Sequence, residues 1–232
     1  MKTAGVRVEA EYREALENWR RLAEENPAEY GPQAAATLHN LANLHYKTQR
    51  PAEAESEYGE ALSIYRKLAT SRPEVHEADV AMTLNNLANL HGDMLRRSEA
   101  ESEYEEALAI RRKLAAAQPE VYESGVATTL SNLANLHDDM LRLSEAEAEY
   151  GEALAIRRRL AKGSPEAHEP GVATTLYNMA LLFEESGRNE GALAAARESA
   201  ETYGRCAERN PQRYGGDLED AKALVARLEQ NA

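Results

Sequence analysis

The sequence has little cysteine, few aromatic residues and no long apolar run. Cys206 is the only cysteine among 232 residues, so an internal disulfide is excluded and a reducing compartment is the simpler assumption. No apolar stretch approaches the length of about 18 residues that a transmembrane helix needs. Met1–Val8 lacks the apolar core of a secretory signal peptide. These absences predict a cytoplasmic protein.

Motifs of catalytic chemistry are missing as well. The sequence has no glycine-rich phosphate loop, no nucleophile elbow and no His-Glu-x-x-His pair. Its many carboxylates are predicted to lie on exposed helical faces, where nothing would separate the pKa values of an acid and a base. We therefore expect a protein that is not an enzyme and that needs no cofactor.

The chain is acidic, with 40 Asp and Glu residues, 27 Lys and Arg residues and a net charge of −13. This balance argues against nucleic acid or an anionic membrane as the main partner. Ala, Glu, Leu and Arg dominate the composition, and all four are good helix formers. Composition therefore favours a soluble, all-helical protein.

The most informative feature that is present is an internal repeat. The run Thr-Leu-x-Asn-Leu-Ala-Asn-Leu-His occurs at residues 37–45, 83–91 and 129–137, and a degraded copy occupies 175–183. Each copy starts 46 residues after the previous one. Such a period is typical of a solenoid, in which repeats stack on their neighbours instead of closing around one core. Because solenoids usually act through their surfaces, a groove is a better candidate site than a catalytic pocket.

Each period is predicted to form two helices. Leu84, Leu87, Ala88 and His91 fall at positions i, i+3, i+4 and i+7, which makes one apolar stripe on a first helix. The second helix follows the same pattern with Ala100, Tyr104, Ala107, Leu108 and Leu114. Small alanines at fixed places let neighbouring helix axes approach closely. Antiparallel helix pairs are the expected result.

These stripe residues carry a family resemblance. Their spacing is similar to the tetratricopeptide repeat signature, and the run that ends at His91 resembles the longer repeats of the kinesin light chain type. The resemblance implies an all-α, right-handed superhelical solenoid that acts as a protein–protein interaction scaffold. Two features depart from the pattern. The period is 46, and the glycine usual between the two helices occurs only as Gly187, with Gln49, Leu95 and Leu141 at the equivalent positions.

The expected array is a single unit over residues 1–232. A leading unpaired helix near 8–26 precedes four helix pairs near 33–70, 77–117, 123–162 and 169–209, and a terminal helix lies near 216–230. Prolines at the same period, starting with Pro27 and Pro73, are expected to break the chain between pairs. The unpaired leading helix would be a cap, or the chain would be a piece of a longer array.

Helical geometry predicts which side chains would face a groove. The resemblance implies that first helices line the concave face, so the side opposite the core stripe should look into it. The candidate peptide-binding residues there are Asn40, Asn43, Asn86, Asn89, Asp93, Asn132, Asn135, Asp139 and Asn178. A carboxamide has donors and an acceptor, so a ladder of asparagines would pair with the backbone of an extended peptide. The same asparagines could instead cross-link adjacent first helices as structural hydrogen bonds.

Other residues refine the expected partner. Asp93, Asp138, Asp139, Glu184 and Glu185 gather toward one end of the first helices, which favours a neutral-to-basic peptide, or they form an ordinary solvated face. The periodic histidines invite a metal interpretation, but they belong to different repeats. Neighbouring helix axes lie about 8–10 Å apart, too far for shared zinc ligands. We therefore predict no metal site and place His45, His91 and His137 in the core.

Three functions remain open from the sequence. The preferred one is a scaffold that binds a peptide in its groove. A second is self-assembly, end to end or as a dimer, through the leading helix Glu9–Glu25 and the final helix Leu218–Leu228. A third is a regulatory module of a larger signalling protein. The sequence names no partner.

Overall fold

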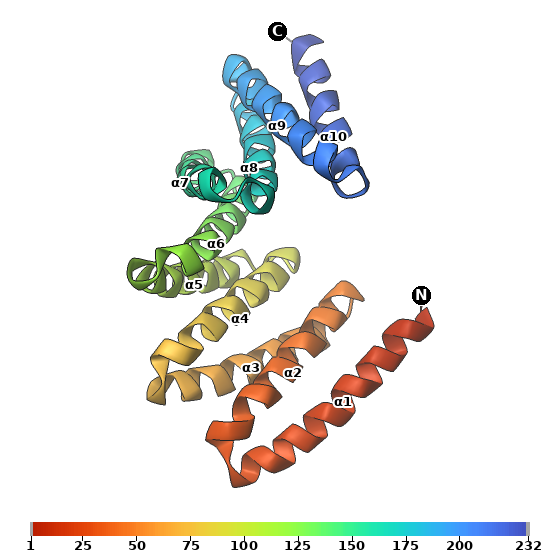
Figure 1. Ribbon diagram of the computed structural model, residues 1–232, viewed down its shortest axis with the longest axis vertical. Coiled ribbons are helices and arrows are strands. Elements are labelled where there is room, and N and C mark those ends of the chain that lie inside the picture. The colour runs from red at the N-terminus through yellow and green to blue at the C-terminus, as the bar shows by residue number, and fades with distance from the viewer. Residues whose placement is uncertain (1, 231–232) are drawn as a thin grey trace. The chain divides into compact units, whose positions relative to one another are not determined.

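The computed structural model describes residues 2–230, with side chains for residues 7–230, and every regular element in this part is an α-helix (Figure 1). The helices are α1 (Lys2–Glu25), α2 (Pro27–Lys47), α3 (Pro51–Ser71), α4 (Pro73–Asp93), α5 (Arg97–Ala117), α6 (Pro119–Asp139), α7 (Leu143–Gly163), α8 (Pro165–Glu185), α9 (Asn189–Arg209) and α10 (Pro211–Gln230). None of these helices is both long enough and apolar enough to span a membrane.

The helices form two compact units, Met1–Leu114 and Ala115–Ala232. In the first unit α1 packs on α2, α2 on α3 and α3 on α4; in the second, α6 packs on α7, α7 on α8, α8 on α9 and α9 on α10. Within each unit these packed neighbours run in opposite directions (Figure 1). The predicted antiparallel pairs are therefore present within each unit.

The helix pairs begin earlier than predicted. The first helices start at Pro27, Pro73, Pro119 and Pro165, earlier than the starts near 33, 77, 123 and 169 that the sequence pattern predicts. The terminal helix likewise starts at Pro211 and not near 216. Proline breaks a helix in its interior, but at the first helical position its missing N–H costs nothing and its fixed φ suits the helix. A single residue therefore suffices for these junctions: Asn26 joins α1 to the first pair, and Arg72 joins the first pair to the second.

The turn inside each pair has one conformation in all four copies. Gln49, Leu95, Leu141 and Gly187 have φ values of 59°, 61°, 59° and 71°. In each turn the residue after the positive-φ position donates its backbone N–H to the carbonyl of the residue five positions before it. Arg96 makes this bond to His91 at 2.9 Å. This bond closes a left-handed cap of the Schellman type, which glycine ordinarily occupies. The turn is thus conserved among the copies although three of them lack the glycine.

Leucine is a costly residue for this turn, and this gives the first prediction. Leu95 and Leu141 are 70% and 78% exposed, so they gain little from burial while they hold a positive φ. We expect Leu95→Gly and Leu141→Gly each to raise the free energy of unfolding by about 1 kcal/mol, measured by urea denaturation. Val121→Gly is the matched control, because Val121 is exposed in the first turn of α6, and it should lose about 0.5 kcal/mol. A loss in the two turn variants would contradict the assigned turn.

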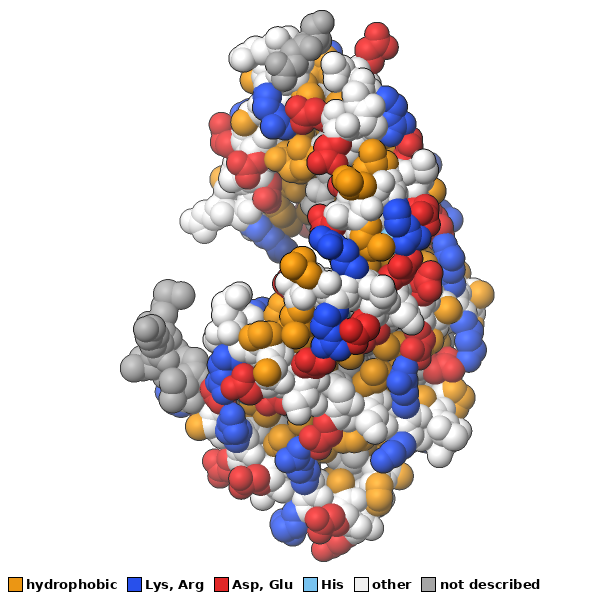
Figure 2. All heavy atoms as spheres, turned by 180° about the vertical axis from the view of Figure 1, so that it is seen from behind, with side chains coloured by type: hydrophobic (Ala, Val, Ile, Leu, Met, Phe, Trp, Pro, Cys, Tyr) orange, Lys and Arg blue, Asp and Glu red, His pale blue; other side chains and the backbone are white. Residues whose placement is uncertain are grey.

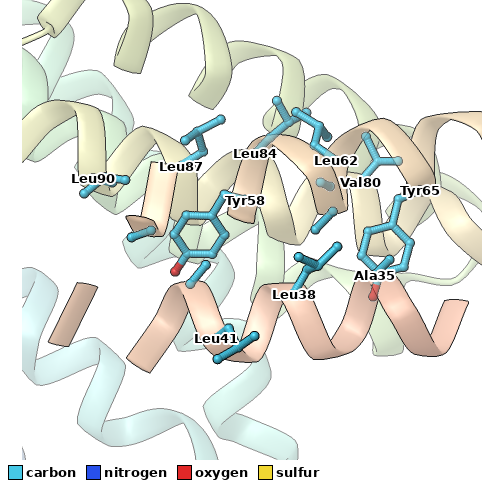
Figure 3. Close-up of a cluster of buried hydrophobic side chains, with 14 of the residues drawn as sticks. Ala35, Leu38, Leu41, Tyr58, Leu62, Tyr65, Val80, Leu84, Leu87 and Leu90 are labelled. Carbon is cyan, nitrogen blue, oxygen red and sulfur yellow. The ribbon is translucent and has the colours of Figure 1, made fainter. Parts of the chain in front are cut away.

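The core of the first unit is built from leucine, alanine and tyrosine. Tyr58 and Tyr65 of α3 lie between α2 and α4, among Leu38, Leu84 and other apolar side chains (Figure 3). Ala61 of α3 is fully buried, and its small side chain allows close approach of the neighbouring helices. The second unit repeats this composition, with Tyr150, Leu176, Leu182, Ala180 and Ala196 buried. Period-46 positions therefore form the core, as the stripes predict.

Ion pairs link alternate helices of the chain across the surface. Arg20 pairs with Glu60 at 2.5 Å and Arg66 with Glu106 at 2.6 Å in the first unit, and Arg158 pairs with Glu198 at 2.5 Å in the second. Figure 2 shows basic and acidic side chains interspersed over the face that it presents. Exposed pairs of this kind each stabilise a fold by less than about 1 kcal/mol. Local pairing thus neutralises individual acidic side chains of this surface, while the net charge stays negative.

Candidate functional site

The predicted asparagine positions lie at the surface of the first helices. We call the nine candidate residues the asparagine strip. In the first unit Asn40 and Asp93 are exposed while Asn43, Asn86 and Asn89 are half-buried. In the second unit the exposed members are Asn135 and Asp139, and the half-buried members are Asn132 and Asn178. Every member therefore has atoms that a ligand can reach.

Three of the first helices carry a second strip asparagine, at positions 43, 89 and 135, and a core tyrosine holds each of them. Tyr58 donates its hydroxyl hydrogen to Asn43 Oδ1 at 2.6 Å, Tyr104 donates to Asn89 Oδ1 at 2.5 Å, and Tyr150 donates to Asn135 Oδ1. Each amide oxygen is therefore turned toward the second helix of its own pair. A primary amide has two N–H donors besides its oxygen, so the group left for a ligand is an NH₂.

The fourth pair changes both partners of this hydrogen bond together. Leu181 occupies the asparagine position, and Ala196, which is fully buried, occupies the tyrosine position. A buried hydroxyl without an acceptor costs about 1–3 kcal/mol, so losing both polar groups is less costly than losing one. The joint change indicates that these asparagines have a structural partner in addition to any ligand.

The strip asparagine nearer the start of a first helix bonds to the neighbouring first helix in two cases. Asn86 Nδ2 lies 3.1 Å from His39 Nε2, which joins α4 to α2 in the first unit. Asn178 Nδ2 donates to Asn135 Oδ1 at 3.2 Å, which joins α8 to α6 in the second unit. His39 is 5% exposed, and sequence reasoning gave it no role. Its equivalents are Asn85, Ser131 and Tyr177, so no periodic signal marked this position.

The acidic end of the strip has a perturbed carboxyl group. Burial, and then the negative charges of Glu185 and Asp139, raise the pKa of Asp138 to about 6. In the first unit the hydroxyl of Tyr46 donates to Asp93 Oδ2. Desolvation and that carboxylate raise the pKa of Tyr46 above its usual range. A cationic group beside Asp138 would relieve this charge repulsion.

The three periodic histidines are core residues, which confirms their prediction. His45, His91 and His137 are 0%, 4% and 3% exposed. Their Nδ1 atoms lie 2.7 Å from Glu57, 2.9 Å from Glu103 and 2.9 Å from Glu149, respectively.

Sequence reasoning missed these glutamate partners. The available signal was a glutamate twelve residues after each histidine, which disappears in the fourth pair, where Phe183 and Ala195 replace both. Within residues 2–230, no group of three or more His, Cys, Asp or Glu residues is placed to hold a metal ion.

A second glutamate, from the preceding second helix, lies on the other side of the histidine. His45 Nε2 is 3.3 Å from Glu9, and His91 Nε2 is 3.4 Å from Glu55. An arginine of the turn fastens the same glutamate, with Arg50 bonded to Glu9 at 2.8 Å and Arg96 to Glu55 at 2.5 Å. The pKa of Glu9 is lowered to about 2, mainly by its hydrogen bond with Arg13 and also by Arg50 and His45. Burial acts in the opposite direction and is outweighed. These polar bridges tie neighbouring pairs together beneath the turns.

Comparisons with known proteins agree with this arrangement. A family model described as tetratricopeptide repeat matches residues 34–69, 80–117 and 126–166. No curated protein matches the sequence. The solved structure of BtubC (BKLC) from P. vanneervenii shares 25% identity, with a TM-score of 0.67 over 98% of this chain and 90% of that chain.

Two further solved structures share the fold at lower identity. The apo form of RapI is 15% identical, with a TM-score of 0.67 over 95% of this chain and 81% of that chain. MamA is 14% identical, with a TM-score of 0.56 over 87% of this chain and 94% of that chain. The all-α solenoid class and the repeat identity predicted from the sequence are thus confirmed. The chain belongs to the tetratricopeptide repeat family, whose members generally act as scaffolds for protein interaction.

Proposed function

We propose that this protein is a non-enzymatic scaffold that binds an extended, neutral-to-basic peptide segment of a partner protein along the asparagine strip. The observation that carries the proposal is the tyrosine–asparagine hydrogen bond at Asn43, Asn89 and Asn135. It fixes the amide oxygen inward and leaves the NH₂ group as a donor. The carbonyl oxygens of an extended peptide are the acceptors that such donors suit.

The proposed binding depends on groups that are already ordered. Each tyrosine ring is buried in the core, with Tyr58, Tyr104 and Tyr150 at 0%, 4% and 1% exposure. A side chain fixed before binding loses little conformational entropy when the ligand arrives. The entropic cost would therefore fall mainly on the peptide. Asp93 and Asp139 would select charge and would influence the association rate more than the affinity.

The test uses an array of unbiased extended peptides and two sets of variants. We expect the double variant Asn89→Ala/Asn135→Ala to lose about tenfold or more in affinity, because each lost hydrogen bond is worth about 0.5–1.5 kcal/mol. The matched control is Tyr104→Phe/Tyr150→Phe, which removes the same intramolecular hydrogen bonds but keeps both amides. It should weaken binding only about twofold to fivefold, since the amides lose their fixed orientation.

Stability measurements separate recognition from folding. Both double variants lose the same tyrosine–asparagine bonds, but the asparagine variant also leaves two buried hydroxyls without acceptors and removes the Asn178–Asn135 bond, so it should lose more stability in urea denaturation. Equal affinity of the asparagine variant and the unaltered chain would contradict the proposal and assign these amides a purely structural role. Peptides that bind best should carry Lys or Arg, and Asp93→Asn/Asp139→Asn should reduce that preference.

A further inference from the structure

The first helix pair differs from the other three at the start of its first helix. Position 31 is glycine, whereas the equivalent positions hold Glu77, Glu123 and Glu169. One helical turn later Ala34 stands where the other pairs have valine, at Val80, Val126 and Val172. Both differences remove side-chain volume from the same place.

The glutamates of the other pairs each bind a basic residue of their own second helix. Glu77 pairs with Lys113 at 2.6 Å, Glu123 with Arg159 at 2.5 Å and Glu169 with Arg205 at 3.0 Å. Lys67 is the equivalent base of the first pair. Among the described residues, no carboxylate lies within ion-pair distance of Lys67. The first pair therefore keeps the cation and lacks its counterion.

A pocket lies where the missing side chain would be. It has a volume of about 430 Å³, and α1, α2 and α3 of the first unit all contribute to its lining. Gly31 and Ala34 line it from α2, while Ile64, Leu68 and Lys67 line it from α3. The pocket thus combines apolar walls with a single unpaired ammonium group. By helical geometry Gly31 lies on the side of α2 opposite Asn40, about 180° around the helix, so the pocket is separate from the asparagine strip.

We propose that this pocket is a binding site for a carboxylate carried on a short apolar stem, the chemistry of a glutamate side chain or of a small free organic acid. The stem would lie against Ile64 and Leu68, and the carboxylate would pair with Lys67. The other three pairs of this chain show the same interaction made internally, with glutamate in the place of the ligand. The site does not depend on peptide binding at the asparagine strip.

The remaining charges at the pocket set the expected strength. Glu60 is engaged by Arg20 at 2.5 Å, so this pair contributes little net charge. Glu24 also lines the pocket and is exposed, and its negative charge opposes an anionic ligand. An exposed ion pair is worth about 1 kcal/mol or less, and the apolar contact adds to it. We therefore expect dissociation constants of about 1–20 mM for small ligands.

The test is an NMR titration of the isotope-labelled full chain with defined probes. Glutarate and a blocked glutamate, N-acetylglutamate amide, should cause saturable shifts at the Gly31 amide and the Lys67 ammonium. Glutaramide and N-acetylglutamine amide, which have the same shape without charge, should cause none. If the blocked glutamate binds more tightly than glutarate, the natural ligand is a glutamate of a protein. The reverse order identifies a free acid. Lys67→Gln should abolish the preference for the charged probes.

The decisive variant makes the first pair like the other three. In Gly31→Glu/Ala34→Val the new glutamate should pair with Lys67, so the chain should fold at least as stably and lose the titration shifts. A Cβ added at Gly31 would lie 3.7 Å from Ile64 and Leu68, an ordinary contact, so position 31 accepts a side chain without a clash at Cβ. Glu24→Gln should tighten binding of the charged probes about twofold to threefold. Absence of saturable shifts in the unaltered chain, or their persistence in the Gly31→Glu/Ala34→Val variant, would overturn the proposal.

Discussion

Replacing Tyr58 by alanine is expected to lower the free energy of unfolding by about 3–5 kcal/mol. The ring is fully buried between α2 and α4, stands edge-on to His39 with centroids 5.4 Å apart, and donates its hydroxyl hydrogen to Asn43. Alanine removes the packing and the hydrogen bond and leaves a cavity between three helices. Tyr58→Phe removes only the hydrogen bond and should cost about 1 kcal/mol. Guanidinium unfolding followed by circular dichroism measures both.

The chain supplies a control for this prediction at the equivalent position of α1. Tyr12 is only half-buried, so Tyr12→Ala should cost far less than Tyr58→Ala. Equal losses for Tyr58→Ala and Tyr58→Phe would mean that the ring contributes nothing beyond its hydroxyl. That result would contradict the packing argument.

His91→Phe is expected to lower the free energy of unfolding by about 2–3 kcal/mol at pH 7. Glu103, which is 19% exposed, would lose the imidazole that lies 2.9 Å from its carboxylate. The fourth pair shows how the same site becomes apolar without this penalty, because Phe183 and Ala195 replace histidine and glutamate together. The double variant His91→Phe/Glu103→Ala should therefore recover most of the loss. Urea denaturation of the two variants and the unaltered chain measures the difference.

The stability that His91→Phe loses should be larger at pH 7 than at pH 4.5. Burial raises the pKa of Glu103 above its ordinary value of 4.5, and the neighbouring His91 opposes that rise. Without the histidine the folded-state pKa of Glu103 rises further, so this carboxyl binds its proton more tightly in the folded chain than in the unfolded chain. Stability then falls as pH increases from 4.5 through the folded-state pKa, and it returns as pH decreases. The difference in unfolding free energy between the single and the double variant should therefore shrink toward pH 4.5. A constant difference from pH 7 to pH 4.5 would exclude an uncompensated carboxylate as its cause.

Proline shows where sequence reasoning about the helices succeeds and where it fails. The 46-residue period and the stripes through Leu84 and Tyr104 predict the number and order of the helix pairs, because apolar spacing directly reflects which face of a helix is buried. The helix starts were placed too late, because proline both breaks helices and begins them. The left-handed turns at Leu95 and Leu141 were not predicted either. Leucine disfavours that conformation, and only the packing of the two flanking helices imposes it.

By itself, the sequence determined the repeat, the helical class, the burial of the periodic histidines and tyrosines, and the surface position of the asparagines. All of these follow from spacing along one helix, which the sequence contains in full. Only the tertiary structure decided that tyrosine orients asparagine, that glutamate meets histidine, and that the counterion of Lys67 is missing beside a pocket. These facts depend on which side chains of different helices meet and in what orientation. Such meetings are set by packing distances between helices, which periodicity along a single helix does not encode.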